Sequence, residues 1–217
     1  MKPAIFALAL ALAAWSSPAT SDQHLAPSPS SVLKTLHAGN QRYVHHKIVH
    51  PHQSRLLRQR LVAGQHPVAA ILSCADSRVP PELVFDQGLG DLFTVRVAGN
   101  VVDDAILGSL EYAVEHLHVP VILVLGHIGC GAVQATIAGG EPNTHIDSLV
   151  KAIRPAVEQA SHEAGVLMDN AVRDNVQLAV KQLQDANPIL AMMSAQGKIQ
   201  IKGAVYHMDT GVVEFLK

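Results

Sequence analysis

Three stretches of this chain are apolar on successive residues over about the length of a strand, and they limit what the chain can fold into. They cover residues 68–73, 92–97 and 119–125. A strand with one face in water alternates between apolar and polar residues, whereas a strand that is covered on both faces does not. The three stretches therefore predict a parallel sheet that lies between layers of helices.

The segments around these stretches carry apolar residues at helical spacing. Apolar residues recur three or four positions apart between residues 104 and 117, and again between residues 172 and 183, which places them on one face of a helix. Two further helices are expected before the first strand. One is capped by Ser31, and the other spans residues 54–63 and ends at Gly64.

The end of the chain has a different pattern. Residues 198–206 and 212–216 have strand character, and the turn signal Asp209-Thr210-Gly211 lies between them. The predicted fold class is therefore α/β, a mostly parallel central sheet flanked by helices, with a C-terminal edge hairpin. In such a fold the functional groups are expected at the carboxyl ends of the strands.

The amino terminus has the pattern of an export signal. A basic residue precedes a run of twelve apolar residues that ends at Trp15, and small residues follow up to a cleavage point after Ala19. Such a run is too short to span a bilayer, although an uncleaved anchor or a buried N-terminal helix is the alternative. We expect a periplasmic or secreted protein with a signal peptide (1–19), a linker (20–30) and a single domain (31–217).

The composition excludes one class of partner. The chain has 16 basic and 18 acidic residues, a formal net charge of -2, and no basic block that could follow a phosphate backbone. Nucleic acid is therefore not an expected partner. Hydrophobic residues make up 48% of the chain, which suffices for one sizeable core and favours a single domain.

Three side chains that bind zinc well stand at the predicted strand ends. Cys74 follows the first apolar stretch directly, and His127 and Cys130 follow the third. Because the carboxyl ends of parallel strands lie along one edge of the sheet, these residues can converge. Two thiolates and one imidazole would give zinc three protein ligands and leave its fourth tetrahedral position open, as in catalytic sites.

The two cysteines also allow a hypothesis from another class. Cysteines of an exported protein commonly form a disulfide, and a bond between Cys74 and Cys130 would make the chain a non-catalytic secreted module that binds a partner. The neighbouring residues argue against it, because both cysteines lie in polar and glycine-rich segments, Ser-Cys-Ala-Asp-Ser-Arg and Gly-His-Ile-Gly-Cys-Gly. A structural disulfide needs none of these neighbours.

Several motifs of this chain resemble those of the β-class carbonic anhydrases. The resemblance covers nearly all of the predicted domain, and its specificity comes from the order and spacing of the motifs, because each one alone occurs by chance. The motifs are Gly39-Asn40-Gln41-Arg42-Tyr43, Cys74-Ala75-Asp76-Ser77-Arg78, Arg96-Val97-Ala98-Gly99-Asn100, His127-Ile128-Gly129-Cys130-Gly131, Gly203-Ala204-Val205-Tyr206 and Asp209-Thr210-Gly211.

The resemblance implies a lyase that reversibly hydrates carbon dioxide to bicarbonate and a proton, with one Zn2+ per subunit. Its ligands would be Cys74, His127 and Cys130, and zinc-bound hydroxide would be the nucleophile. Asp76 would orient the hydroxide, since a carboxylate only accepts hydrogen bonds, and Arg78 would keep Asp76 ionised and in place. Taken alone, these two residues would be explained as a helix cap or a surface ion pair.

The resemblance also implies a substrate pocket and an oligomer. Gln65, Phe93 and Tyr112 would line the place where carbon dioxide sits, some of them contributed by a partner subunit, and the N–H of Gly131 would lie near the bound product. The expected assembly is a homodimer or a dimer of dimers. Taken alone, Tyr112 resembles an ordinary aromatic residue of a helix and Phe93 a core residue of a strand.

The sequence leaves two questions open, the substrate and the state of the zinc site. Relatives of this fold hydrolyse carbonyl sulfide or carbon disulfide with the same ligands and dyad, so the ligand set does not exclude that activity. One subgroup of the family carries tryptophan where this chain has Ile71, and in that subgroup the aspartate can bind zinc in a closed state. We therefore expect the open form, with Asp76 paired to Arg78. Activity is expected to rise with pH, because two thiolates cancel the charge of Zn2+ and bound water is then less acidic than beside three imidazoles.

Overall fold

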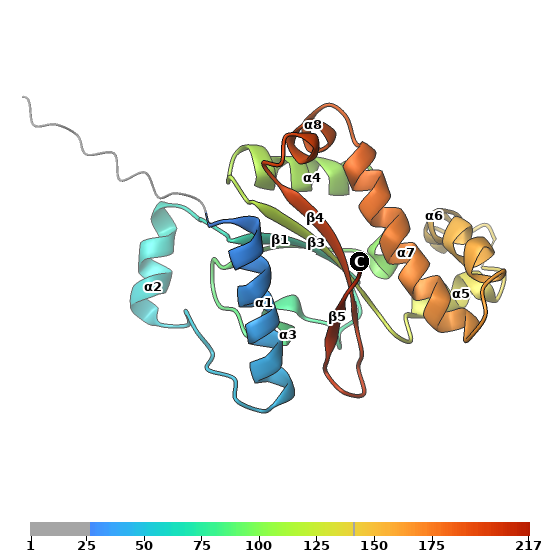
Figure 1. Ribbon diagram of the computed structural model, residues 1–217, viewed down its shortest axis with the longest axis horizontal. Helices are drawn as coiled ribbons and strands as arrows, with labels where there is room; N and C mark the ends of the chain where they lie inside the picture. Colours follow the sequence, from blue (N-terminus) through green and yellow to red (C-terminus); the bar gives the residue numbers. More distant parts are fainter. Residues whose placement is uncertain (1–26, 141) are drawn as a thin grey trace, which may run out of the picture.

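The computed structural model describes residues 27–140 and 142–217, so the predicted signal peptide and most of the predicted linker lie outside the described residues. Within these residues a five-stranded sheet forms the centre, in the strand order β2-β1-β3-β4-β5 (Figure 1). Its strands are β1 (Ala69–Ser73), β2 (Leu92–Arg96), β3 (Val121–His127), β4 (Gln200–Tyr206) and β5 (Val213–Phe215). All neighbouring strands are parallel except β4 and β5, which form the antiparallel C-terminal hairpin. The predicted fold class is confirmed.

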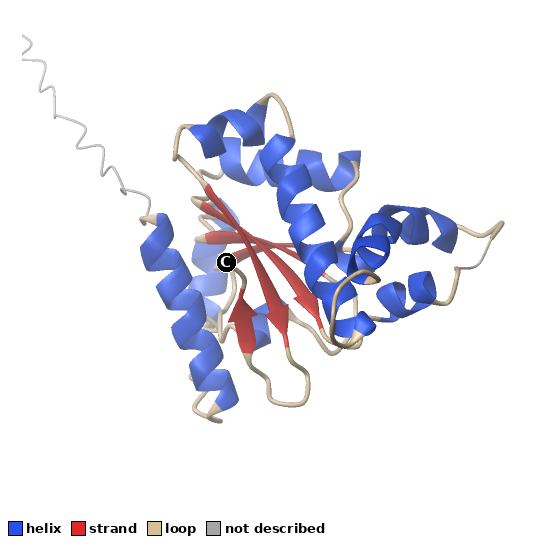
Figure 2. Ribbon diagram, turned by 45° about the vertical axis from the view of Figure 1, so that its right-hand side comes forward, coloured by secondary structure: helices blue, strands red, loops and turns tan. Residues whose placement is uncertain are grey.

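Helices cover both faces of this sheet (Figure 2). They are α1 (Pro29–Val44), α2 (Arg55–Arg60), α3 (Pro81–Val84), α4 (Asp104–Glu115), α5 (Gly131–Ile137), α6 (Ile146–Ala160), α7 (Leu167–Asp185) and α8 (Ile189–Ala195), with short 3-10 helices η1 (Leu61–Ala63) and η2 (Ala98–Asn100). Side chains of α1 and α3 pack on one face of the sheet, and side chains of α4, α6, α7 and α8 pack on the other. Among the described helices, none is long and apolar enough to cross a membrane.

Successive residues of a central strand enter two different cores. Ala70 and Leu72 of β1 pack with α4 and α7, whereas Ala69 and Ile71 pack with α1. Both faces of β1 and β3 are buried throughout, which explains their continuous apolar sequence. The same expectation is wrong for β2, in which four residues are partly buried and Arg96 is exposed, because β2 is one of the two edge strands of the sheet.

Several element boundaries differ from the sequence prediction by one to three residues, and two of these differences concern residues with a predicted role. The cap of α1 is Ser28 and not Ser31, and the helix begins at Pro29 inside the predicted linker. Proline suits this position because an N–H group in the first turn has no hydrogen-bond partner within the helix, so its absence costs nothing. Strand β3 continues two residues beyond Leu125, so His127 is its last residue and does not follow it.

The Gly39–Tyr43 motif fastens the first helix to the end of the chain. Asn40 is buried, and its Nδ2 donates hydrogen bonds to the carbonyl oxygens of Val84 (3.1 Å) and Gly211 (2.8 Å). Its Oδ1 accepts a hydrogen bond from the N–H of Val213 at 2.9 Å. One side chain therefore joins α1, the end of α3 and the β4–β5 hairpin, and we call these three hydrogen bonds the clasp at Asn40.

Candidate metal centre and catalytic site

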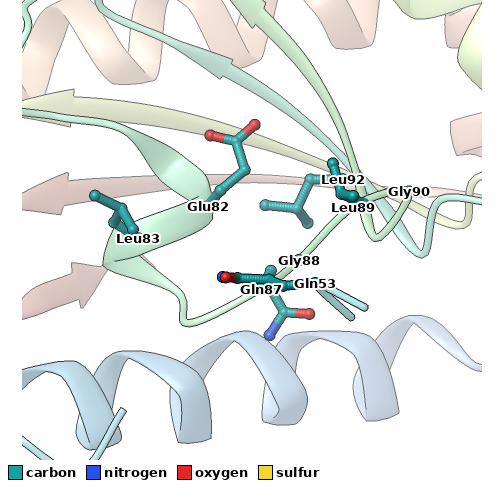
Figure 3. A pocket seen from close by; sticks show the side chains of 8 residues that line it. All are labelled: Gln53, Glu82, Leu83, Gln87, Gly88, Leu89, Gly90 and Leu92. Atoms are coloured by element: carbon teal, nitrogen blue, oxygen red, sulfur yellow. The ribbon is translucent and has the colours of Figure 1, made fainter. Parts of the chain in front are cut away.

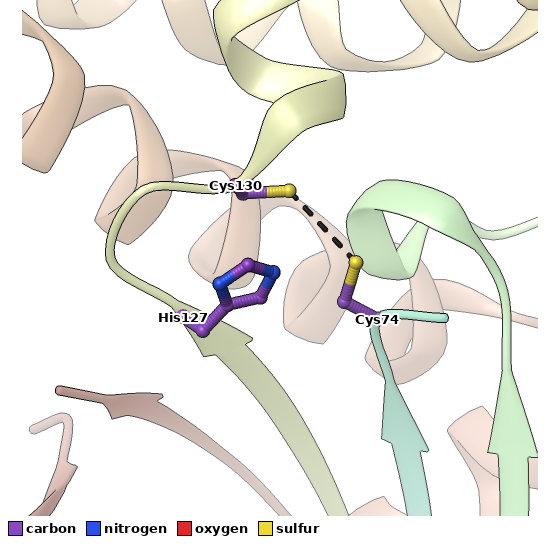
Figure 4. Close-up of side chains that lie close together, drawn as sticks. All are labelled: Cys74, His127 and Cys130. Carbon is purple, nitrogen blue, oxygen red and sulfur yellow. Dashed lines mark hydrogen bonds between the residues drawn. The ribbon is translucent and has the colours of Figure 1, made fainter. Parts of the chain in front are cut away.

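Three residues from two neighbouring strands and one helix converge at the carboxyl edge of the sheet. Cys74 follows β1, His127 ends β3, and Cys130 caps the N-terminus of α5. All three are buried, and their ligand atoms lie within 4.8 Å of one another. The sulfur atoms of Cys74 and Cys130 are 3.9 Å apart, with the imidazole of His127 beside them (Figure 4). The predicted convergence is thus present.

The geometry of these donors suits a tetrahedral metal ion. Two Zn–S bonds of the usual length at a tetrahedral angle would separate the sulfur atoms by about 3.8 Å, and the observed separation is 3.9 Å. Nδ1 of His127 lies 3.1 Å from the carbonyl oxygen of Ile128, so a proton on Nδ1 leaves the lone pair on Nε2. That buried Nε2 atom has no hydrogen-bond partner among the described residues, which a metal ion would supply.

The two thiols differ in acidity. A hydrogen bond from the Cys130 thiol lowers the pKa of Cys74 to about 4 in spite of burial, and His127 and the N–H groups of Asp76 and Gly99 lower it further. The pKa of Cys130 is raised, because its thiol donates to Cys74 and is itself buried. The two sulfur atoms thus hold a single proton between them, and a divalent cation could replace it as both thiols ionise.

Asp76 and Arg78 form a bidentate ion pair beside this centre. Nε of Arg78 donates to Oδ1 of Asp76 at 2.9 Å, and Nη2 donates to Oδ2 at 2.7 Å. The backbone N–H of Arg78 adds a third hydrogen bond to Oδ1. Mainly through its side chain, Arg78 holds the pKa of Asp76 well below the usual range, and partial burial opposes this. Asp76 is therefore ionised at neutral pH.

Arg96 begins one of the family motifs, although the sequence predicted no role for it. It is the last residue of β2, and its Nε donates to the carbonyl oxygen of Cys74 at 3.1 Å. Its Nη2 donates to the carbonyl oxygen of Asp76 at 2.5 Å. Arg96 therefore fastens the loop that carries one ligand and the carboxylate to the neighbouring strand. The signal available in the sequence was its place in the motif at the end of a strand.

Three of the four predicted pocket residues lie apart from the metal centre of their own chain. Phe93 lies opposite Ala70 in β1, four residues before Cys74, which corresponds to about 13 Å along the strand. The ring of Tyr112 lies against Phe93, with centroids 6.3 Å apart, and Gln65 is exposed in the loop before β1. Gly131 differs from these three, because it follows Cys130 directly and begins α5.

A surface cavity of about 460 Å³ lies away from the metal centre, at the start of β2 (Figure 3). It contains none of the three converging residues. Two of its leucines, Leu83 and Leu89, are about half exposed, so this side of the edge strand presents apolar surface to solvent. The lining residues are Gln53, Glu82, Leu83, Gln87, Gly88, Leu89, Gly90 and Leu92.

Comparisons with known proteins agree on one family. The family model described as carbonic anhydrase matches residues 69–213. The chain is 42% identical over 188 residues to carbonic anhydrase 2 of Mycobacterium tuberculosis. The matched region covers 85% of this chain and 91% of that protein. Among solved structures, the β-carbonic anhydrase CcaA has a TM-score of 0.68 at 28% identity and covers 85% of this chain and 95% of its own. The Coccomyxa β-carbonic anhydrase in complex with acetazolamide has a TM-score of 0.66 at 28% identity, with 86% and 85% covered.

Proposed function

This chain belongs to the β-carbonic anhydrase family and is an enzyme that interconverts carbon dioxide and bicarbonate, and from this premise we propose that its metal is zinc, bound by Cys74, His127 and Cys130. The observation that carries the proposal is the buried set of two sulfur atoms and one unpartnered imidazole nitrogen at tetrahedral spacing. Bound zinc supplies a Lewis acid that lowers the pKa of water. Three protein ligands leave one position for it.

Asp76 is proposed to orient the nucleophile. As an ionised carboxylate it can only accept a hydrogen bond, so a solvent molecule that donates its proton to Asp76 turns a lone pair toward the substrate carbon. Arg78 binds both carboxylate oxygens, and the guanidinium keeps its proton throughout the working pH range. The pair therefore favours the open form, in which Asp76 stays with Arg78.

The substrate pocket is proposed to be shared between two subunits of a homodimer. Phe93 lies in β2 opposite Ala70, four residues before Cys74 in the neighbouring strand. Tyr112 of α4 stacks against Phe93 and is 47% exposed. The edge strand β2 beside them is only partly buried, which leaves room for a second copy. In this arrangement Phe93, Tyr112 and Gln65 line the partner's pocket, while the N–H of Gly131 serves its own.

The two alternative functions are not favoured. A disulfide module would need Cys74 and Cys130 to be bonded, but both are free thiols with sulfur atoms 3.9 Å apart, far beyond the length of a disulfide bond. Hydrolysis of carbonyl sulfide or carbon disulfide would use the same residues. The matching family model and the relatives named above are carbonic anhydrases, so carbon dioxide is the expected substrate.

Stopped-flow hydration of carbon dioxide on protein of measured zinc content tests the metal and the reaction together. We expect about one zinc per subunit, loss of activity on removal with a chelator, and recovery when zinc alone is returned. Carbonyl sulfide turnover is measured on the same preparation and should be much slower. Full activity in zinc-free protein would overturn the metal assignment, and faster turnover of carbonyl sulfide would overturn the substrate assignment.

We also propose that the enzyme is exported to the periplasm or secreted. The support is the signal-peptide pattern of residues 1–19. Mass spectrometry of the protein recovered outside the cytoplasm should give a mature chain that begins at Thr20. An uncut chain in the cytoplasm would exclude export by this route.

A further inference from the structure

One residue of α7 breaks an otherwise apolar stripe. The buried positions around it are Ala171, Val172, Val176 and Ala179, and Asn175 lies among them with 3% of its surface exposed. Because it is four residues from both Ala171 and Ala179, it occupies a core position of the helix. Burying a side-chain amide costs free energy unless the amide is hydrogen-bonded. A partner for Asn175 is therefore required.

The partner is a backbone group of the metal centre. Nδ2 of Asn175 donates to the carbonyl oxygen of Gly99 at 2.7 Å, across 76 residues of sequence. The N–H of the same glycine donates to Sγ of Cys74 at 3.4 Å. Gly99 thus accepts one hydrogen bond from α7 and gives another to a metal ligand.

The backbone at Gly99 needs this support. Gly99 has φ = 71° inside the short η2 segment, a left-handed conformation that glycine adopts at little cost but is equally free to leave. Its N–H and carbonyl lie on adjoining peptide planes, so a bond that fixes the carbonyl limits how far the N–H can turn. A side chain at this position would meet Cδ1 of Ile153 at 2.6 Å, so glycine is required here and rigidity has to come from a neighbour.

We infer that Asn175 is a positioning residue of the metal centre, which through Gly99 holds an N–H group on the sulfur of Cys74. That hydrogen bond stabilises the negative charge a thiolate carries as a ligand and restricts the direction of its lone pairs. Residues that orient metal ligands in this way commonly change metal affinity by roughly 10–100-fold. The inference rests on the proposed zinc site, and it adds to that site a residue of α7, the helix that packs in the same core as Cys74 and Cys130.

The test is the zinc affinity of the full-length enzyme, measured by competition with a chromophoric chelator. Asn175→Leu, which keeps most of the volume but donates no hydrogen bond, should bind zinc roughly 10–100-fold more weakly than the wild type. Asn175→Ala should shift in the same direction. With cobalt in place of zinc, both variants should also shift the thiolate-to-cobalt charge-transfer band, because the Cys74 sulfur loses an aligned donor.

Two variants on the same helix serve as matched controls. Asn170→Ala removes an equivalent amide-to-carbonyl bond, to Ala164, at the surface, and should leave zinc affinity unchanged. Leu183→Ala empties a fully buried position about 12 Å further along the helix. This variant should lower the melting temperature without lowering zinc affinity. It therefore separates an effect on the position of the ligand from a general loss of stability.

Each outcome decides a different point. Wild-type zinc affinity and an unshifted cobalt band in the Asn175 variants would overturn the inference, and so would equal weakening in Leu183→Ala. A wild-type chain that binds no zinc would overturn the proposed function itself. If neither variant folds, amide exchange in the zinc-loaded wild type decides: the Gly99 amide should exchange slowly, and rapid exchange would contradict its bond to Cys74.

Discussion

Oδ2 of Asp76 lies 3.8 Å from Nε2 of His127, while both oxygens of the same carboxylate accept hydrogen bonds from Arg78. The carboxylate therefore stands beside the proposed metal position but is held by a guanidinium. A side chain so placed can orient a solvent molecule, and it would become a competing ligand if Arg78 released it. The ion pair thus decides which of the two roles Asp76 has.

Asp76→Asn should keep zinc but slow hydration of carbon dioxide by about 100- to 1000-fold, in the range found when one orienting polar group is removed from an active site. The amide donates as well as accepts hydrogen bonds, so it no longer selects one orientation of the nucleophile. Stopped-flow rates and zinc content measure this. Asp147→Asn, which removes a carboxylate paired with Lys151 on α6, is the control. An unchanged rate at full zinc occupancy would remove Asp76 from the mechanism.

Cys74→Ser and His127→Ala should each lose zinc and activity together. Mutation of a residue that only supports a ligand lowers metal affinity by roughly 10–100-fold, so mutation of a ligand itself should lower it further. Zinc analysis and hydration rates are measured on the same samples, with His162→Ala as a control for removal of an exposed histidine. A variant that retains full activity would show that its residue is not a ligand.

Glu214→Gln should destabilise the protein in a pH-dependent way. Arg173, and more weakly His207, lower the pKa of Glu214 to about 2. A lowered pKa contributes stability above the unfolded-state value near 4.5, and this contribution disappears as the pH falls toward 2. Since the pair is partly exposed, the contribution should be under about 1 kcal/mol. The melting temperatures of wild type and variant should differ at pH 7 and converge below pH 4.5, and a constant difference would contradict this.

Asn40→Ala should destabilise the domain by roughly 3 kcal/mol, because it leaves two carbonyl oxygens and one N–H of the clasp without their partner. Urea unfolding of the zinc-loaded enzyme measures the free energy. Asn170→Ala removes a single surface bond and should cost less than about 0.5 kcal/mol. Equal costs for the two variants would show that the clasp is not a stabilising feature.

Tyr112→Ala and Cys74→Ser should complement each other if the pocket is shared. Each variant alone should have low activity. After subunit exchange, a mixed dimer has one site with all three metal ligands and the partner's Tyr112. About half of the dimers in an equimolar mixture are mixed and each has one complete site of two, so about a quarter of the wild-type activity should return. Light scattering verifies the dimer. No recovery after verified exchange would show that Tyr112 acts only within its own chain.

The central strands and the ligands were predictable because both depend on local sequence. β1 and β3 are buried on both faces, so their apolar pattern is unbroken, and Cys74 and His127 stand where these strands end. The exposure of β2 was not predictable, since the strand order that puts it at the edge depends on distant pairings. Helix α6 was not predicted either, although Val150, Ile153 and Ala156 have helical spacing; Pro155, a residue that disfavours a helix interior, lies inside it.

The residues that support the ligands were harder to find. Arg96 acts on the backbone of Cys74 and Asp76, and Asn175 acts on a carbonyl 76 residues away. Bonds to backbone groups leave no complementary residue type in the sequence, so only the folded arrangement reveals the partner. For Asn175, the sign available in the sequence was an asparagine inside an apolar helical stripe.

The clasp at Asn40 has a consequence for the order of events during synthesis. Asn40 bonds residues 171 and 173 positions later in the chain, so the first helix leaves the ribosome long before its anchor exists. Ordering so large a loop is slow relative to local helix formation. α1 can pack on β1, β3 and α3 before that, but its bonds to the hairpin form only after the last strand has been translated. A truncation that removes Val213 would leave the Oδ1 atom of Asn40 without this partner in every newly made molecule.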